Sequence, residues 1–341
     1  MKTALPEWLV YCRSGFERDC AEETRARTLE AEANSGYAVL QGKPRLQFSE
    51  LAFARQLIRL HALADNLPER DRLTPLLAAI PQTPQTFGAL WLEVPDTNEG
   101  KMLSGFIKRF GPLLEENLRA AGRLADDRKL PRLHIFFPDK NRALIGTSDP
   151  TNSAATPMGI LRLKMPHDAP SRSYLKLAEA FETFLTPEQQ QKWLGTGMHA
   201  VDLGAAPGGW SWCLVQRGLK VVAVDNGPLK GLAAEHPHIR HLRQDGFRYR
   251  PKKPVDWLVC DMVEQPQRVA ALMADWLASG LSQRAIFNLK LPMKKRVTAL
   301  DDALAIVRGM LDAKKLKYSL RAKQLYHDRE EVTVFAARGK R

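Results

Sequence analysis

Val201-Asp-Leu-Gly-Ala-Ala-Pro-Gly-Gly-Trp210 is the stretch of sequence that decides the fold of this chain. It joins an apolar strand candidate, residues 199–203, to a helix candidate, residues 210–217, through a turn of small residues. Such a turn lets the backbone approach a ligand closely, and the start of the helix offers free N–H groups. The spacing is neither G-x-G-x-x-G nor G-x-x-x-x-G-K-[ST], and Pro207 removes a donor. A ligand with a carboxylate therefore fits this turn better than a diphosphate does.

The segments around this turn alternate between strand and helix patterns. A helix is expected over 173–185 and another over 266–278, while Leu300, Leu304, Val307 and Leu311 mark a long helix. Strands are expected at 220–224, 239–243, 257–260 and 285–289, and two more, 318–325 and 332–337, close the chain. This order predicts an α/β fold with a doubly wound, mostly parallel sheet and an antiparallel edge.

The first half of the chain reads as a separate α+β region. Strands are expected at 8–13, 37–41, 89–94, 132–137 and 142–146, and helices at 16–32, 49–64 and 102–121. Residues 147–170 are rich in Ser, Thr, Pro and Asn, which predicts a connection between domains. We therefore expect two domains, residues 1–160 and 161–341.

Charge separates the two halves of the chain. Residues 1–160 carry 21 Lys and Arg against 20 Asp and Glu, whereas residues 161–341 carry 30 against 18. Nearly all of the net charge of +13 therefore lies in the second half, which favours a polyanionic partner over charge that serves solubility alone. No apolar run approaches the roughly 20 residues of a membrane helix. Four cysteines without C-x-x-C spacing suit a cytoplasmic protein without a structural metal.

Acidic residues follow the predicted strands next to the glycine turn. Asp225 ends the second strand, where a carboxylate could accept both hydroxyls of a ribose, and Asp245 lies where one could accept an adenine amino proton. Either residue alone could be a turn or cap residue. Together they indicate an adenosyl ligand without a diphosphate, for which S-adenosylmethionine is the natural candidate.

The end of the fourth strand bears on the reaction. The Asn/Asp-Pro-Pro-aromatic tetrad of amine methylation is absent, and Cys260 precedes Asp261, so its thiol should point to the opposite face as a core residue. Asp261 and Lys290 end neighbouring strands, Lys176 lies on the preceding helix, and Glu331 follows the last turn. A lysine base held near neutrality by a second cation would suit a ribose 2′-hydroxyl.

This set of residues resembles a known family. Ser171-Arg-Ser-Tyr-Leu-Lys176, the glycine turn, Asp261, Lys290 and Glu331 are similar to the Lys-Asp-Lys-Glu 2′-O-ribose methyltransferases of the FtsJ type. The resemblance covers about residues 171–341. It implies a class I, Rossmann-like methyltransferase domain that uses S-adenosylmethionine. The larger N-terminal region resembles a THUMP-like, ferredoxin-like RNA-binding region found in a bacterial member that methylates a cytidine ribose of 23S ribosomal RNA.

The resemblance also implies site residues and partners. Lys290 would accept the proton, and Asp261, Lys176 and Glu331 would complete the tetrad. Glu331 is preferred to Glu330 because the family's glutamate directly precedes an apolar strand residue, as Glu331 does. The methyl donor would be lined by Ser173, Ala206, Pro207, Gly208, Gly209, Trp210, Asp225, Asp245 and Asp261. Ser173 could instead be a helix N-cap. The partner would be 23S ribosomal RNA or a large-subunit assembly precursor. A monomer is expected from the sequence itself, because no strong apolar interface pattern appears.

Basic residues with interleaved aromatics predict an RNA-binding surface. Three groups stand out: Arg240, Arg243, Arg248, Arg250, Lys252 and Lys253 with Tyr249 and Trp257; Lys294, Lys295 and Arg296; and Lys314, Lys315, Lys317, Arg321 and Lys323 with Tyr318. The last group could equally be a solvated helix end. Two alternatives to ribose methylation stay open, namely an RNA base methyltransferase and a non-catalytic assembly factor on the same fold.

Overall fold

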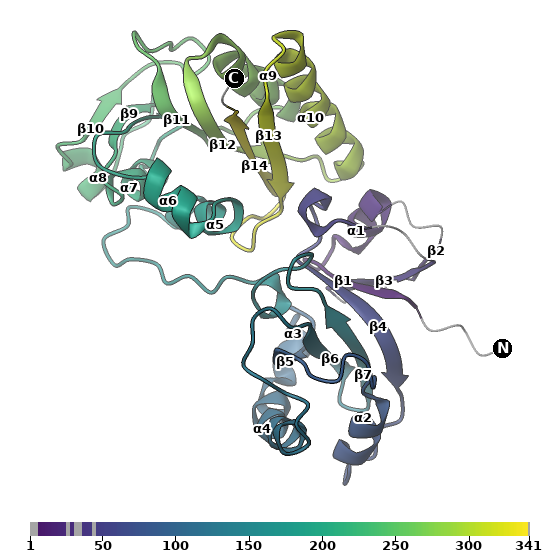
Figure 1. Cartoon of the computed structure of the whole chain (residues 1–341). Coiled ribbons are helices and arrows are strands. Elements are labelled where there is room, and N and C mark those ends of the chain that lie inside the picture. Colours follow the sequence, from purple (N-terminus) through teal and green to yellow (C-terminus); the bar gives the residue numbers. More distant parts are fainter. Residues whose placement is uncertain (1–5, 25–27, 31–35, 43–45, 340–341) are drawn as a thin grey trace. The chain divides into compact units, whose positions relative to one another are not determined.

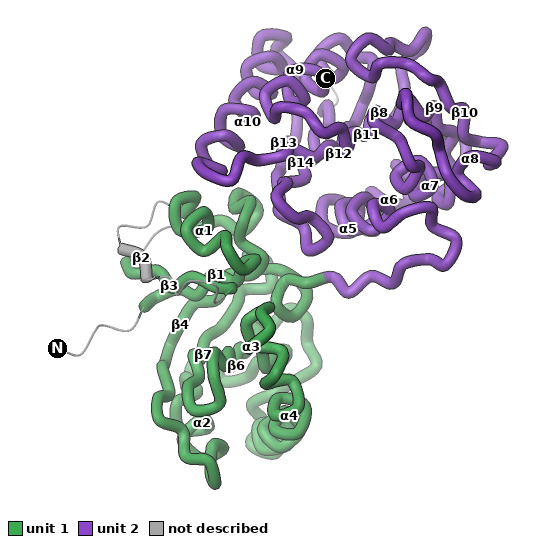
Figure 2. The backbone as a smooth tube through the Cα atoms, turned by 180° about the vertical axis from the view of Figure 1, so that it is seen from behind, with its two compact units in different colours: residues 1–160 green, residues 161–341 purple. Residues whose placement is uncertain are grey.

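A computed structural model describes residues 6–24, 28–30, 36–42 and 46–339 of the chain. The chain divides into two compact units, residues 1–160 and residues 161–341, which Figure 2 draws in different colours. Each unit contains one seven-stranded sheet (Figure 1). In the described part of the chain, no helix combines the length and the hydropathy that a membrane span needs.

The sheet of the second unit has the strand order β10-β9-β8-β11-β12-β14-β13. The parallel strands are β8 (His199–Leu203), β9 (Lys220–Val224), β10 (Ile239–Leu242), β11 (Val255–Cys260) and β12 (Ser282–Lys290). Strand β14 (Glu331–Arg338) runs antiparallel to both β12 and β13 (Tyr318–Lys323). The predicted doubly wound sheet with an antiparallel edge is confirmed.

Helices cover this sheet and leave the carboxyl ends of its parallel strands accessible. Helices α5 (Ser173–Phe184) and α7 (Gly209–Val215) pack on one face. There Phe181 meets the indole of Trp257, and Phe184 stacks on Phe335. Helix α9 (Pro266–Ser279) packs against β12, and α10 (Arg296–Ala313) packs against α9. Two short helices, α6 (Pro187–Trp193) and α8 (Leu232–Glu235), complete the unit.

The first unit is built on the sheet β2-β3-β1-β4-β7-β6-β5, which confirms an α+β region. Its strands are β1 (Trp8–Tyr11), β2 (Thr28–Glu30), β3 (Tyr37–Gln41), β4 (Gln56–Ala64), β5 (Ala89–Glu93), β6 (Arg132–Asp139) and β7 (Arg142–Ser148). Its helices are α1 (Glu17–Thr24), α2 (Leu73–Ala79), α3 (Asn98–Met102) and α4 (Ser104–Ala120). The predicted hairpin is the antiparallel pair β6–β7.

The helix predicted over 49–64 is wrong. Residues 48–50 form a single 3-10 turn, and strand β4 begins at Gln56. This strand pairs with β1 on one side and β7 on the other. The carboxylate of Glu23 accepts hydrogen bonds from the backbone N–H groups of Ala52, Phe53 and Ala54, so these donors have partners in the irregular stretch before the strand. The helical spacing of the apolar residues is outweighed by hydrogen bonding to strands that are distant in the sequence. A local sequence pattern carries no information about those partner strands.

Several boundaries differ from the predictions by a few residues, and the following three differences are the most informative. The helix expected over 16–32 ends at Thr24, residues 28–30 are a strand, and residues 25–27 and 31–32 lie outside the described part. The helix expected over 102–121 is split at Leu103 into α3 and α4. The connection expected over 147–170 begins later, because β7 extends to Ser148, and it contains a 3-10 turn, η2 (Pro157–Gly159).

Candidate active site

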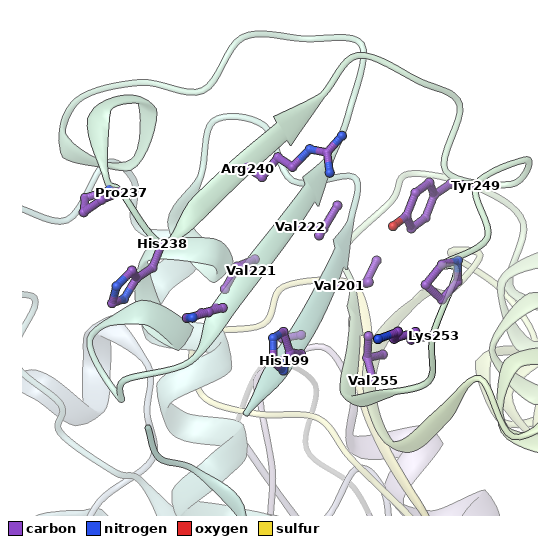
Figure 3. A pocket seen from close by; sticks show the side chains of 13 residues that line it. His199, Val201, Val221, Val222, Pro237, His238, Arg240, Tyr249, Lys253 and Val255 are labelled. Atoms are coloured by element: carbon purple, nitrogen blue, oxygen red, sulfur yellow. The ribbon is translucent and has the colours of Figure 1, made fainter. Parts of the chain in front are cut away.

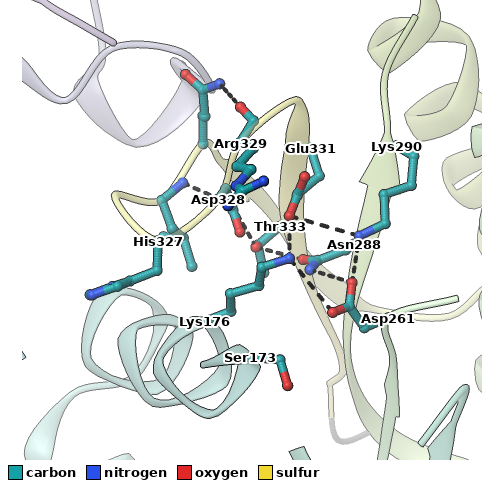
Figure 4. Close-up of polar contacts among 12 residues, drawn as sticks. Ser173, Lys176, Asp261, Asn288, Lys290, His327, Asp328, Arg329, Glu331 and Thr333 are labelled. Atoms are coloured by element: carbon teal, nitrogen blue, oxygen red, sulfur yellow. Dashed lines mark hydrogen bonds and ion pairs between the residues drawn. The ribbon is translucent and has the colours of Figure 1, made fainter. Parts of the chain in front are cut away.

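Four ionisable side chains converge at the carboxyl end of the sheet in the second unit (Figure 4). Asp261 directly follows β11, Lys290 is the last residue of β12, and Glu331 is the first residue of β14. Lys176 reaches the same place from α5, which packs on β14. The structure therefore brings together all four residues that the sequence placed in the tetrad.

Asp261 is the centre of this cluster. The amine of Lys290 lies 2.6 Å from Asp261 Oδ1, and the amine of Lys176 lies 3.6 Å from Asp261 Oδ2. Glu331 Oε1 forms an ion pair with Lys176 and lies 3.8 Å from the Lys290 amine. The side chains are 8–24% exposed, with Lys290 the most accessible at 24%. Lys290 is thus the member of the cluster best placed to meet a substrate.

Two carboxylates determine the charge state of Lys176. Burial by itself lowers the pKa of Lys176, but the carboxylates of Asp261 and Glu331 outweigh it, so the net pKa of Lys176 is raised. Lys176 is therefore a cation at neutral pH. Lys290 shares the Asp261 carboxylate with this cation, each amine facing a different oxygen.

The adjacent residues Glu330 and Glu331 lie in different environments at the start of β14. The Glu331 side chain is 8% exposed and belongs to the cluster, whereas the Glu330 side chain is 56% exposed and pairs with Arg296 at 3.0 Å. Glu330 lies in the bend before β14, whereas Glu331 is the first residue of the strand and the register partner of Lys290. The structure thus places Glu331, the residue preferred from the sequence, among the lysines.

Two polar residues that the sequence analysis did not single out support the cluster. Asn288 Nδ2 donates to Asp261 Oδ1 at 2.9 Å, and the hydroxyl of Thr333 donates to Asn288 Oδ1 at 2.7 Å. Both residues are fully buried. Asn288 lies two positions before Lys290 on β12, so it shares a face with that lysine. Period-two spacing from Lys290 is the signal that could have identified it.

The glycine turn is packed against the beginning of α5. A Cβ on Gly209 would lie 2.2 Å from Ser173 Oγ and 2.5 Å from Ser171 Oγ, and a Cβ on Gly208, whose φ is +112°, would lie 2.6 Å from the Cβ of Ala233. Only glycine permits this close approach. Ser173 is the first residue of α5 and not its N-cap, and its hydroxyl bonds that of Ser171 at 2.6 Å.

The carboxylates predicted to bind the adenosyl group lie around this turn. Asp225 Oδ2 accepts the Ala206 N–H at 3.0 Å, and Asp225 Oδ1 accepts the Gly227 N–H at 2.7 Å. Asp245 follows β10; its Oδ1 accepts the Phe247 N–H at 2.8 Å, and its side chain is 48% exposed. The glycine cradle and these two acceptors fit an adenosyl ligand, because each carboxylate oxygen retains acceptor capacity.

Three further residues of the region lie in the protein interior. The Trp210 side chain is only 2% exposed and belongs to the hydrophobic core. Trp210 could therefore contact the methyl donor only through its backbone. Asp202 is fully buried, accepts the Ser211 hydroxyl at 2.7 Å, and has its pKa raised to about 7 by burial. Burial raises the pKa of the Cys260 thiol to about 12, in keeping with the core position expected for it.

The predicted RNA-binding groups divide in the structure. Trp257 is fully buried and donates its indole N–H to the carbonyl of Trp193. Arg321 lies over the rings of Phe184 and Phe335, and Lys323 is buried. Trp257 and Lys323 are therefore buried and do not belong to an exposed surface, whereas Arg321 is partly exposed. Lys294 and Lys295 are exposed immediately before α10.

Three family models match the chain. The model described as FtsJ-like methyltransferase matches residues 169–294, which include the glycine turn, Asp261 and Lys290. The model described as ribosomal RNA large subunit methyltransferase M, N-terminal, matches residues 71–149, and an RlmM ferredoxin-like domain matches residues 5–44. The class I methyltransferase fold and the ferredoxin-like N-terminal region are thereby confirmed, while the THUMP likeness stays a prediction.

Curated relatives are similar over their whole length. A protein of Laribacter hongkongensis named ribosomal RNA large subunit methyltransferase M is 56% identical over 97% of this chain and 96% of its own length. The protein of that name from Xylella fastidiosa (strain M12) is 46% identical over 96% of this chain and 98% of its own length.

Solved structures are similar at a much lower level. TrmN from Thermus thermophilus is 17% identical, with a TM-score of 0.35, over 98% of this chain and 99% of that one. Fibrillarin from Aeropyrum pernix, in complex with S-adenosyl-L-methionine, is 16% identical, with a TM-score of 0.35, over 60% of this chain and 81% of that one.

Proposed function

Because this chain belongs to the ribosomal RNA large subunit methyltransferase M family, we propose that it methylates the ribose 2′-hydroxyl of a cytidine in 23S ribosomal RNA, with Lys290 as the proton acceptor. The protein is an rRNA methyltransferase that uses S-adenosylmethionine for 2′-O methylation. The target nucleotide and the roles of individual residues are the proposed part. The ion pairs of Lys290 and Lys176 with Asp261 at the carboxyl end of the sheet support the residue roles, and the family resemblance is the ground for the cytidine.

The proposed roles follow from the distances in the cluster. Bound S-adenosylmethionine supplies a methyl group on a positively charged sulfur. Lys290, as the neutral amine, takes the 2′-hydroxyl proton while the ribose oxygen forms its bond to the methyl carbon. Bound S-adenosylmethionine would supply this carbon, and its sulfur would keep the electrons of the broken carbon–sulfur bond. Lys176 remains a cation throughout, because the carboxylates of Asp261 and Glu331 hold its proton.

Asp261 orients both lysines, since each of its oxygens faces one of the two amines. Asn288 fixes the rotation of that carboxylate through its hydrogen bond to Oδ1. The glycine turn, Ser173, Asp225 and Asp245 would hold the donor. Pre-positioned groups of this kind reduce the barrier by presenting reacting atoms in a productive geometry.

Replacement of Lys290 tests this proposal. Lys290→Ala should reduce methyl transfer to the RNA by roughly 10²–10⁴-fold, the usual contribution of a general base. Binding of S-adenosylmethionine by isothermal titration should stay nearly unchanged. Lys192→Ala, at an exposed lysine on α6, is the matched control and should retain full activity. Full activity of Lys290→Ala would show that another group accepts the proton.

Mapping the methyl group separates the ribose from the base. A 2′-O-methyl group protects the adjacent phosphodiester from alkaline cleavage, whereas a base methyl group does not. The buried thiol of Cys260, with its raised pKa, is unsuited to act as the nucleophile that carbon methylation of cytosine requires. A non-catalytic assembly factor would bind RNA without any methyl transfer under the same conditions.

We further infer that the enzyme acts as a monomer in the cytoplasm, where ribosomal RNA of bacteria is made. Its substrate would be 23S ribosomal RNA or a precursor of the large subunit. Sedimentation of the purified chain would test the monomer. Activity on naked RNA compared with activity on isolated precursor particles would distinguish the two substrates.

A further inference from the structure

One crossover of the second unit has no helix. The connections from β8 to β9, β9 to β10, and β11 to β12 contain α7, α8 and α9, but residues 243–254, between β10 and β11, form neither helix nor strand. Strands β9 and β8 separate β10 from β11 in the sheet, so this segment passes across them. It leaves part of the sheet face opposite α5 and α7 uncovered, and an open groove of about 410 Å³ results (Figure 3).

The floor of this groove is apolar and its rim is basic. Val201, Val222 and Val255 contribute to the floor, and the ring of Tyr249 forms part of one wall. The cations at the rim are Lys220, Arg240 and Lys253, and all three are exposed. His199 and His238 stand near one end. The described residues that line the groove include no aspartate or glutamate.

The three cations at the rim keep their charges available. No ion pair joins Lys220, Arg240 or Lys253 to a carboxylate among residues 6–24, 28–30, 36–42 and 46–339. Other basic residues of the same sequence cluster differ, since Arg248 pairs with Asp245 and Arg250 pairs with Asp275. The nearby carboxylate of Asp256 accepts the backbone N–H of His199. Of the basic group between residues 240 and 253, Arg240 and Lys253 line the groove, and Lys220 of β9 joins them from outside that group.

Tyr249 adds a surface on which a base could stack. Its side chain is half-buried, with the ring centroid 6.2 Å from that of Trp276. A half-buried ring of this kind, beside unpaired cations and an apolar floor, is the combination with which proteins bind single-stranded nucleic acid. An acidic protein surface would use the cations but would have no need of the ring.

We propose that the groove between residues 243–254 and strands β8–β10 binds a single-stranded segment of the substrate RNA that flanks the methylated nucleotide. The inference rests on the proposed function, because it assumes an RNA substrate. The cluster around Asp261 lies at the carboxyl ends of the strands, whereas His199 and Lys220 begin β8 and β9. A strand of this length spans about 13 Å at the usual rise per residue. An RNA chain that runs from the groove to the carboxyl ends of the strands would hold the target ribose in place beside the cluster around Asp261.

Charge reversal in the groove tests the proposal with the full-length chain. The variant is Lys220→Glu with Arg240→Glu, and the matched control is Lys192→Glu with Arg308→Glu, at two exposed cations on α6 and α10. Binding of a fluorescein-labelled, mixed-sequence single-stranded RNA is followed by anisotropy across a series of salt concentrations. Each lost phosphate contact lowers the slope of log K against log salt by about 0.7 for single strands. The groove variant should therefore lose about 1.4 from the slope and bind at least tenfold more weakly at about 0.1 M salt, whereas the control should change little.

Tyr249 provides a second, uncharged test. Tyr249→Ala should weaken RNA binding by about tenfold, in the range measured for loss of one stacked base, and Tyr249→Phe should retain binding because it keeps the ring. Titration with S-adenosylmethionine checks that each variant is folded. Lys253→Glu, in the loop, repeats the charge test if the strand variant does not fold.

RNA affinity of the groove variants equal to that of the control would overturn the inference, including the case in which the groove binds an acidic protein. That result is distinct from failure of the proposed function. The wild-type chain would then still methylate the ribose of its RNA, whereas failure of the proposed function would leave the wild type without ribose methylation whatever the binding data show.

Discussion

Lys290 and Glu331 are register partners in the antiparallel pair β12–β14, and their charged ends lie 3.8 Å apart at the edge of the sheet that carries the site. The backbone ladder therefore fixes this relationship, although the residues are far apart in sequence. Lys176 bonds the same oxygen of Glu331 from α5. One carboxylate at the start of a strand thus ties a helix to the end of a neighbouring strand.

Glu331→Gln should lower methyl transfer by roughly 10²-fold, at the low end of what loss of acid–base chemistry costs. The amide removes the charge that raises the pKa of Lys176 and leaves two amines facing one carboxylate. Single-turnover kinetics measure the effect. Glu330→Gln is the matched control, since the Glu330 side chain is exposed and pairs only with Arg296 in the described contacts. Equal activity of the two variants would contradict the role assigned to Glu331.

Gly209→Ala should weaken donor binding and methyl transfer together. The new Cβ would lie 2.2 Å from Ser173 Oγ and 2.9 Å from the backbone nitrogen of Tyr174, so the start of α5 must move. That helix carries Lys176, and a shift of about 1 Å at such a site can cost 10²-fold in rate. Isothermal titration and single-turnover kinetics measure the two losses. Gly195→Ala, where a Cβ would meet nothing within 4 Å, is the control. A Gly209→Ala enzyme with wild-type donor affinity would argue against the cradle.

The second unit could be predicted closely because its determinants are local. Strands β9, β11 and β12 are apolar runs with an acid or a lysine at or directly after their last residue, and strand order then brings those ends to one edge. Asp261 and Lys290 could be paired in this way from the sequence pattern alone. Lys176 and Glu331 could be suggested only as residues that would complete the set, because nothing in the local sequence marks a residue of α5 and the first residue of β14 as neighbours.

The first unit was harder to predict, and the segment 49–64 shows why. Leu57, Ile58 and Leu60 fit a helical spacing, yet they belong to a strand whose two neighbours, β1 and β7, come from distant parts of the chain. In the same way, the missing helix between β10 and β11 leaves a groove that no sequence window reveals. Sequence patterns reflect the local propensity of a segment for helix or strand. Strand pairing and the uncovered part of a sheet face depend on how the whole sheet is assembled.

Cys260→Ala should keep methyl transfer within about twofold of the wild type, because the thiol is fully buried and burial raises its pKa to about 12. The variant should lose about 1 kcal/mol of stability through the small cavity that it leaves in the core. Transfer assays with radiolabelled donor and urea unfolding measure the two effects. Loss of all activity with normal donor binding would instead favour a cysteine nucleophile and base methylation.

Asp202→Asn should change how stability depends on pH. Burial raises the folded-state pKa of Asp202 from 3.8 to about 7, so the native chain retains a proton that the unfolded chain releases. The wild type should therefore lose stability, relative to the variant, as pH rises from about 4 to 7, and the difference should level off above pH 7. The pKa change corresponds to a free energy on the order of 4 kcal/mol.

Urea unfolding midpoints of the wild type and Asp202→Asn, measured without S-adenosylmethionine at several pH values between 5 and 8, provide the test. Asn can still accept the Ser211 hydroxyl, so the hydrogen bond is kept while the titration is removed. Parallel pH profiles for the two proteins would show that Asp202 is ionised in the native state throughout this range.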